Sequence, residues 1–159
     1  MLKGGIPLKI VKLQYEEFSV YEEKILDLLI ETYSINFDIS IDSSIELSKE
    51  KLSLLKTYIK ENKAIVLVSL DENILTGFVW LHKHEFFKET RLHVNQIAVD
   101  SQHRGKGIAK ELLIKTEGVS AEVGSKIIDL FVSETNESAI GLYEKLGFKT
   151  ERRYMKREL

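Results

Sequence analysis

The segment Gln102–Ala109 (Gln-His-Arg-Gly-Lys-Gly-Ile-Ala) combines two glycines with three side chains that can donate hydrogen bonds to an anion. It lies between an apolar run, Val94–Val99, and a run with helical spacing of apolar residues that ends near Val123. Glycines let the backbone approach a ligand, and the first N–H groups of a helix have no partner within the helix. The helix dipole also favours an anion at this end. The segment therefore predicts a phosphate-binding turn between a strand and a helix.

Two common phosphate motifs do not fit this turn. The dinucleotide fingerprint G-x-G-x-x-G fails because Lys110 stands where the third glycine is needed. The triphosphate loop G-x-x-x-x-G-K-[ST] is absent, and so is an acidic pair placed beside the turn to hold Mg²⁺. His82 and His84 flank an expected loop without acidic or cysteine partners at metal spacing. We therefore expect a phosphate anhydride held by backbone groups, and no metal.

Composition narrows the class of protein. The chain has 159 residues, the size of one ordinary domain, so we expect a single domain over residues 1–159. A formal net charge of −2 argues against a general nucleic-acid binder, and the absence of cysteine excludes a cysteine nucleophile. No apolar run approaches the roughly 18 residues of a membrane span, and Met1–Pro7 lacks the apolar core of a signal peptide. We expect a cytoplasmic protein without nucleic-acid or membrane partners.

Apolar spacing predicts a strand, two helices, a three-strand meander, and then a helix, a strand, a helix and a closing hairpin. The expected strands are Ile10–Leu13, Ala64–Leu70, Leu75–His82, Arg91–Val99 and Lys126–Ser133, followed by a hairpin over Phe148–Glu158. The expected helices contain Tyr21–Tyr33, Ile45–Lys60, the run from Ile108 to Val123, and Asn136–Leu146 capped by Gly147, with a turn-like Ser34–Ser44. This order predicts an α/β fold with a mixed, mostly antiparallel central sheet and helices on both faces.

A family resemblance rests on three segments. Arg104–Ala109, here called the glycine turn, matches Q/R-x-x-G-x-G/A, the acetyl-CoA pyrophosphate loop of the GCN5-related N-acetyltransferases (GNAT). Asn95–Asp100 resembles the fourth strand of that family, and Asn136–Phe148 resembles its second conserved block. The resemblance is strong from about residue 64 to the end, and the first third agrees only in element order. The sequence is therefore similar to small, bacterial-type, single-domain GNAT proteins with the acyl-CoA N-acyltransferase fold.

The resemblance implies an acetyl-CoA-dependent N-acetyltransferase that moves an acetyl group to a primary amine of a small molecule or peptide through a tetrahedral intermediate. In the family a bulge separates the fourth strand from the fifth, and pantetheine pairs with the free strand. The implied cofactor-binding residues are the strand residues Ile97, Ala98 and Val99, the turn residues Arg104, Gly105, Lys106, Gly107, Ile108 and Ala109, and the helix residues Asn136 and Tyr143. Asn136 also fits a helix N-cap, and Tyr143 alone also fits a core aromatic. In the family this tyrosine donates a proton or a hydrogen bond to the thiolate of coenzyme A.

The sequence offers more than one candidate for the general base. Many relatives carry a glutamate on the fourth strand, but Leu92–Ile97 contains no carboxylate. His93 is the nearest titratable group, and histidine in general has a pKa near 6.5, which suits a base. Glu85 in the preceding loop is a rival, and Asn95 could position a water instead. The missing carboxylate supports an alternative, a non-catalytic regulatory or interaction module that binds coenzyme A.

A second alternative is an acyltransferase that uses another acyl-CoA. Family members are commonly dimers, so a homodimer is possible.

Overall fold

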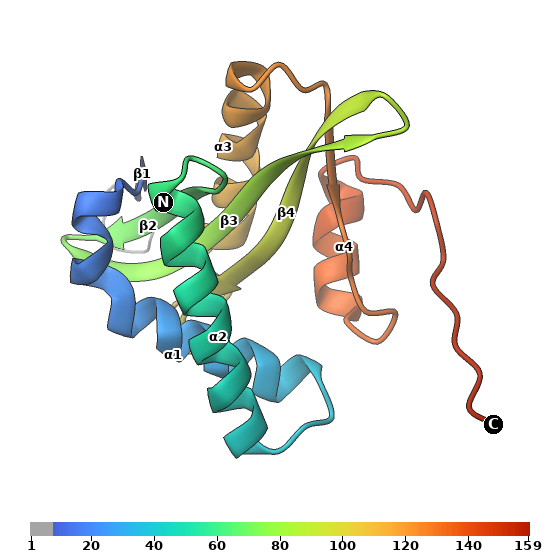
Figure 1. Ribbon diagram of the computed structural model, residues 1–159, viewed down its shortest axis with the longest axis horizontal. Coiled ribbons are helices and arrows are strands. Elements are labelled where there is room, and N and C mark those ends of the chain that lie inside the picture. The colour runs from blue at the N-terminus through green and yellow to red at the C-terminus, as the bar shows by residue number, and fades with distance from the viewer. Residues whose placement is uncertain (1–7) are drawn as a thin grey trace.

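A computed structural model describes residues 8–159, and Met1–Pro7, with the expectation about a signal peptide, lies outside the described residues. The strands are β1 (Lys9–Lys12), β2 (Ile65–Asp71), β3 (Ile74–Phe86), β4 (Glu89–Val99) and β5 (Ile127–Leu130). The helices are α1 (Phe18–Asn36), α2 (Ile41–Lys60), α3 (Ile108–Glu122) and α4 (Glu137–Lys145), with short 3₁₀ turns at Tyr15–Glu17 and Ser101–His103. The strands lie in the order β1-β2-β3-β4-β5, with β5 parallel to β4 and the others antiparallel (Figure 1). The predicted mixed sheet is confirmed.

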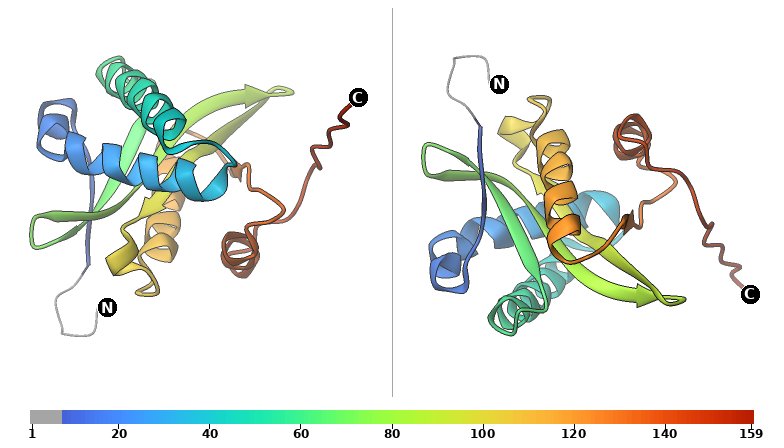
Figure 2. Two further views of the ribbon diagram at one scale, coloured as in Figure 1. Left: turned by 90° about the horizontal axis from the view of Figure 1, so that it is seen from below. Right: turned by 90° about the horizontal axis from the view of Figure 1, so that it is seen from above.

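Helices cover both faces of the sheet, as predicted. Figure 2 shows α1 and α2 on one face and α3 on the other. Because side chains alternate along a strand, Phe78 and Trp80 of β3 enter the core under α1 and α2, while Val79 and Leu81 enter the core under α3. The same alternation places His82 on the α1/α2 face, at the part of β3 that continues beyond this core.

The segment between the first two helices is shorter than the sequence predicts. Helix α1 continues to Asn36, and α2 begins at Ile41, so the turn-like stretch Ser34–Ser44 is mostly helical. Hydroxyl groups of this stretch form hydrogen bonds with the helix backbone. The Ser34 hydroxyl donates to the Ile30 carbonyl at 2.7 Å. The Ser40 hydroxyl accepts from the Ser43 N–H at 3.1 Å and forms the N-cap of α2.

The predicted closing hairpin over Phe148–Glu158 is wrong, because the described chain has no strand after β5. Side-chain contacts hold this segment instead. The guanidinium of buried Arg91 donates to the Glu151 carboxylate at 2.6 and 3.0 Å, and Arg152 lies 4.4 Å from the ring centre of Phe86. Glu151 and Arg152 therefore contact the outer part of β3 and β4 without pairing to the sheet, and the residues from Tyr154 to the end of the chain are exposed. Strand β5 also ends at Leu130, earlier than predicted. None of the helices within residues 8–159 is long and apolar enough to cross a bilayer.

Candidate active site

Strand β4 has a free backbone edge beside the glycine turn. Strand β5 pairs with β4 only from Arg91, opposite Ile127, to Val94, opposite Leu130. The five residues that follow, Asn95–Val99, have no partner on the β5 side among the described residues. At about 3.4 Å per residue this edge is about 17 Å long. We call Asn95–Val99 the free edge; it ends next to the glycine turn.

A bulge marks the point where β4 and β5 separate. On the β3 side, Trp80 pairs with Gln96, while the next residue, Leu81, pairs with Val94. Asn95 is therefore an extra residue in β4, and its side chain is exposed. An extra residue bends a strand and increases its local twist. The bulge that the family resemblance implied is thus present, at the first residue beyond the pairing with β5.

The direction of the backbone groups along the free edge follows from one hydrogen bond. The N–H of Asp100 donates to the carbonyl of Thr76 on the β3 side at 2.9 Å. Because N–H groups of successive strand residues point to opposite sides, the N–H groups of Ile97 and Val99 point away from β3. The Nε of Arg104 donates to the Val99 carbonyl at 3.2 Å, which places that carbonyl on the same open side. The backbone of Ile97 and Val99 is therefore available to a ligand that lies along the free edge.

The glycine turn lies between β4 and α3, as the sequence predicts. Gly105 and Gly107 have φ angles of 74° and 82°, in the left-handed region that glycine tolerates best. Gly107 precedes α3, and its carbonyl accepts the first helical bond, from Glu111 at 3.0 Å. The N–H groups at the start of α3 consequently point out of the helix toward solvent. A Cβ atom built on either glycine would meet no protein atom within 4 Å. The space in front of α3 is open, as a phosphate site requires.

Helix α1 holds the segment that leads from β4 into this turn. The Asp100 carboxylate accepts hydrogen bonds from Lys24 of α1 and from the N–H of Gln102, the latter at 2.8 Å. The hydrogen bond from Lys24 is the main reason why the pKa of Asp100 falls to about 2. Arg104 donates to Glu31 of α1 at 2.9 Å. These contacts fix the path of the chain between the end of β4 and the start of α3.

A helix C-cap positions Tyr143 on α4. The N–H of Phe148 donates to the Tyr143 carbonyl and the N–H of Gly147 donates to the Glu144 carbonyl, both at 3.0 Å. This pair of bonds is a Schellman motif, and Gly147 supplies its left-handed residue with a φ of 87°. The ring of Phe148 packs 5.7 Å from that of Tyr143. Burial raises the pKa of Tyr143, which packs against the core under α3.

Asn136, at the other end of α4, accepts from the N–H of Ala139 at 3.2 Å. Its expected role as an N-cap is confirmed.

Three histidines and one carboxylate lie together where β4 and β5 are still paired. His93 Nδ1 lies 2.8 Å from Asp129 Oδ1, and His84 Nε2 lies 3.1 Å from Asp129 Oδ2. The ring of His82 is centred 5.0 Å from that of His93. We call His82, His84, His93 and Asp129 the histidine–aspartate cluster. His82 and His84 lie within β3 and not beside a loop, and the expectation that they lack an acidic partner is wrong for His84, which Asp129 of β5 contacts.

The cluster has the composition of a metal site, but hydrogen bonds explain its geometry. Ligand atoms of His84, His93 and Asp129 lie within 4.8 Å of one another, and two imidazoles with a carboxylate can bind a transition metal. Both imidazoles, however, already lie at hydrogen-bond distance from the carboxylate. Arg91 Nη1 also lies 3.5 Å from Asp129, so a third group approaches the same carboxylate. We therefore describe the cluster as a hydrogen-bonded network.

The two predicted base candidates lie in different places. His93 joins the cluster with a side chain that is 12% exposed. Glu85 does not join it, because alternation along β3 turns Glu85 to the face opposite His84, where it accepts from the Thr90 hydroxyl at 2.7 Å. The sequence interpretation missed Asp129. A charged residue inside the apolar run Ile127–Leu130 was the signal that could have found it.

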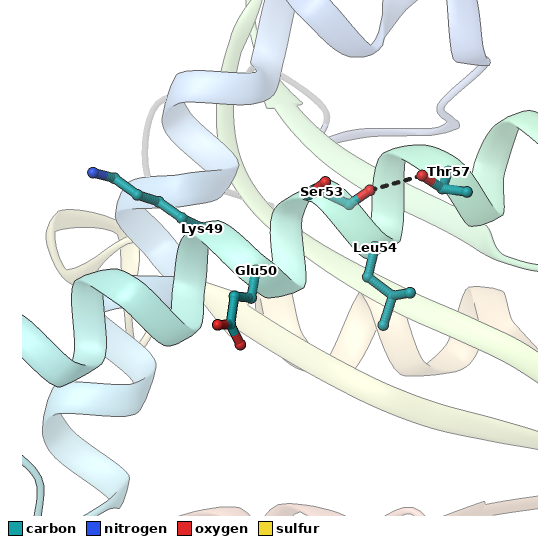
Figure 3. Close-up of a pocket in the computed structure, with 5 residues that line it drawn as sticks. All are labelled: Lys49, Glu50, Ser53, Leu54 and Thr57. Carbon is teal, nitrogen blue, oxygen red and sulfur yellow. Dashed lines mark hydrogen bonds between the residues drawn. The ribbon is translucent and has the colours of Figure 1, made fainter.

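A shallow depression elsewhere on the surface is not part of this site. Figure 3 shows that its lining side chains all come from one exposed face of α2, namely Lys49, Glu50, Ser53, Leu54 and Thr57. The Thr57 hydroxyl donates to the Ser53 carbonyl at 3.1 Å, so one of its few polar groups is already paired. The free edge and the glycine turn contribute nothing to it.

Comparison with known proteins agrees with this geometry. A family model described as "Acetyltransferase (GNAT) family" matches residues 23–148. The chain belongs to the GNAT family. Human N-acetyltransferase 8B is 32% identical over 107 residues, which cover 66% of this chain and 47% of that protein. The catalytic subunit naa20 of the N-terminal acetyltransferase B complex of Schizosaccharomyces pombe is 28% identical over 131 residues, covering 80% of this chain and 63% of the yeast protein. The chain thus spans about half to two-thirds of these GNAT relatives.

Solved GNAT structures share the whole fold. A proposed acetyl transferase from Pyrococcus furiosus superposes with a TM-score of 0.77 and 28% identity, covering 96% of this chain and 100% of that one. A Clostridium acetobutylicum protein that was solved with acetyl-CoA superposes with a TM-score of 0.71 and 16% identity, covering 96% of both chains. The second likeness concerns the fold alone. The predicted GNAT architecture is therefore confirmed.

Proposed function

We propose that this chain transfers an acetyl group from acetyl-CoA to a primary amine. The observation that carries the proposal is the continuity of the free edge, Asn95–Val99, with the glycine turn, Arg104–Ala109. An extended donor molecule can lie along such an edge with its phosphates at the helix N-terminus. Membership of the GNAT family supports this assignment of donor and reaction.

Pantetheine is an extended chain with two amide groups, so it can add to β4 in the manner of a strand. Its partners would be the outward backbone groups of Ile97 and Val99. The pyrophosphate would lie on the N–H groups at the start of α3, next to the exposed side chains of Arg104 and Lys106. Arg104 already donates to the Val99 carbonyl, so a pantetheine amide that bonds this carbonyl would use the second lone pair of the oxygen or displace the guanidinium. Glu31, which accepts from the same guanidinium, can hold the displaced side chain.

The chemistry follows from this placement. The neutral amine attacks the thioester carbon, and the carbonyl oxygen becomes an oxyanion. The N–H of Ile97 or Val99 supplies a fixed donor to that oxyanion. The intermediate then collapses with cleavage of the C–S bond, and coenzyme A leaves as a thiolate. Tyr143 donates a hydrogen bond or a proton to the sulfur; its raised pKa favours the protonated phenol that this role needs.

The names of relatives indicate classes of acceptor to test. The Schizosaccharomyces pombe relative is named as the catalytic subunit of an N-terminal acetyltransferase complex, and structural neighbours include proteins named as aminoglycoside acetyltransferases. The acceptor panel should therefore contain peptides with different N-termini, lysine side chains, aminoglycosides and polyamines. Mass spectrometry would detect the acetylated product.

Two measurements test the proposal. Isothermal titration should show binding of one acetyl-CoA per chain, and no heat at millimolar ligand with folded protein would contradict the donor assignment. Turnover with acyl-CoA donors of increasing chain length should be greatest with acetyl-CoA. A preference for a longer chain would replace acetyl by another acyl group. Binding without transfer to any amine of the panel would favour a non-catalytic module.

A further inference from the structure

The GNAT reaction needs a proton acceptor, because an alkyl amine with a pKa near 10 is almost wholly protonated at neutral pH. The structure places one candidate acceptor, the imidazole of His93, close to the free edge. His93 lies two residues before the bulge at Asn95, on the strand that becomes the free edge. It pairs across the sheet with Asp129, one position before the last pair between β4 and β5. The imidazole thus lies where the two strands begin to separate, at the end of the free edge remote from the glycine turn.

The contact with Asp129 decides which nitrogen of His93 is free. An ionised carboxylate only accepts hydrogen bonds, so the nitrogen 2.8 Å from it, Nδ1, carries a proton. In the neutral ring Nε2 then keeps its lone pair. Burial alone would raise the pKa of Asp129, but hydrogen bonds from His93 and His84 lower it below its usual value, so the carboxylate is ionised.

The neighbouring groups select His93 over the other imidazoles. His84 also bonds to Asp129, but it pairs with Arg91, which lies two residues farther from the bulge than His93. Burial, followed by repulsion from His93 and His84, lowers the pKa of His82, which favours its neutral form. The charged and titratable groups that face the pair from the three strands and the C-terminal segment are His82, His84, Arg91, Glu89 and Glu151. Arg91 is neutralised by Glu89 and Glu151, so Asp129 remains the main charged partner of His93.

We propose that His93 is the general base of acetyl transfer and that Asp129, from β5, positions it. This inference rests on the proposed function. The amine nitrogen forms the new C–N bond with the thioester carbon and gives its proton to Nε2 of His93. The C–S bond breaks with its electron pair on sulfur, and the thiolate is protonated by Tyr143 or solvent. Asp129 stabilises the imidazolium without taking the proton, and His93 then returns the proton to solvent.

The test compares His93→Gln, Asp129→Asn and Glu85→Gln in the full chain with one acceptor. His93→Gln should lower kcat by about 100-fold or more, with little change in the affinity for acetyl-CoA. Asp129→Asn should lower kcat by about tenfold or more, because the amide no longer stabilises the imidazolium. Glu85→Gln, the rival candidate on the opposite face, should remain within about twofold of the wild type.

Two readouts separate this role from a structural one. In Asp129→Asn the acid limb of the plot of kcat/KM against pH should move to lower pH, because the variant lacks the negative charge that stabilises the imidazolium. The acceptor amine titrates in the same way with every variant, so its contribution cancels in the comparison. In His93→Ala, added imidazole should restore turnover in proportion to its concentration.

Retained turnover in His93→Gln, loss of turnover in Glu85→Gln, or an unmoved acid limb in Asp129→Asn would overturn the assignment. So would inactivation of the wild type by a chelator that zinc reverses, because His84, His93 and Asp129 would then be metal ligands. A wild type that binds no acetyl-CoA would instead contradict the proposed function itself.

Discussion

Replacing Gly107 by valine tests two roles of this glycine before α3, namely its left-handed backbone conformation and the open space that it leaves for a phosphate. Gly107 has a φ of 82°, and an added Cβ would meet no protein atom within 4 Å. Gly124, just beyond the other end of α3, has a φ of 74° and equally open surroundings. A helix of 15 residues separates the two sites by about 22 Å. Gly124→Val is therefore a matched control for backbone strain without a ligand.

The strain should be similar in the two variants. A side chain in the left-handed region costs about 2 kcal/mol, which lowers the melting temperature of a chain of this size by about 4–8 °C. Acetyl-CoA at 100 times its Kd stabilises a binding-competent protein by about 2.7 kcal/mol, or about 5–11 °C. The wild type and Gly124→Val should both show this shift. Gly107→Val should lose it, because the valine occupies the space where the pyrophosphate must approach the helix.

Isothermal titration of the folded variants gives the affinities directly. Gly107→Val should raise the Kd for acetyl-CoA at least about tenfold, which is about 1.4 kcal/mol, while Gly124→Val should leave it unchanged. Normal binding by Gly107→Val would show that the phosphate site lies elsewhere. Equal loss of affinity in both variants would show that strain in α3, and not occlusion, weakens binding.

Two further predictions concern other parts of the site. Tyr143→Phe should lower kcat by about 10-fold to 100-fold, the value of a hydrogen bond to an anion, with a smaller change in the Kd for acetyl-CoA; unchanged turnover would remove Tyr143 from the mechanism. Asp100, whose pKa is lowered from 3.8 to about 2 by Lys24 and its other partners, should stabilise the fold fully above pH 4, and this contribution should vanish as the pH falls through 2. In urea unfolding, Asp100→Asn should therefore be less stable than the wild type by up to about 2 kcal/mol at pH 6 and equally stable near pH 2. This figure is an upper bound, because the side chain of Lys24 is 36% exposed and solvent screens the ion pair. A stability difference that stays constant between pH 2 and pH 6 would contradict the ion pair with Lys24.

The strand, turn and helix that form the proposed donor site could be predicted from the sequence because their determinants are local. Gly105 and Gly107 stand between a strand and a helix that the apolar spacing already predicts, and glycine tolerates the left-handed conformation that both adopt. Gly147 likewise follows the last helical residues and supplies the predicted cap. Each of these features depends on residues within about one helical turn.

The histidine–aspartate cluster could not be predicted in the same way, because pairing between distant segments creates it. His84 and Asp129 are 45 positions apart and meet only through the register of β3 with β4 and of β4 with β5. Two sequence signals were present, namely histidines at alternate positions of one strand and a single carboxylate in an apolar strand. They became informative only once the order of the strands was known.

The C-terminal segment shows the limit of alternation as a signal. Phe148–Glu158 has the composition of a hairpin, yet Glu151 and Arg152 contact Arg91 and Phe86 through their side chains, and no backbone pairing follows. Ion pairs and cation–π contacts of this kind are invisible to a pattern of apolar residues.

The most direct measurement of acetyl-CoA binding along β4 is a titration of ¹⁵N-labelled protein followed by NMR. The amide signals of Ile97, Val99, Gly105 and Gly107 should shift most, because those of Ile97 and Val99 face the free edge and the glycines line the phosphate site. The amides around Leu54 on α2 should stay in place. Shifts centred on α2, or no shifts at millimolar acetyl-CoA, would contradict the assignment of the free edge and the glycine turn as the donor site.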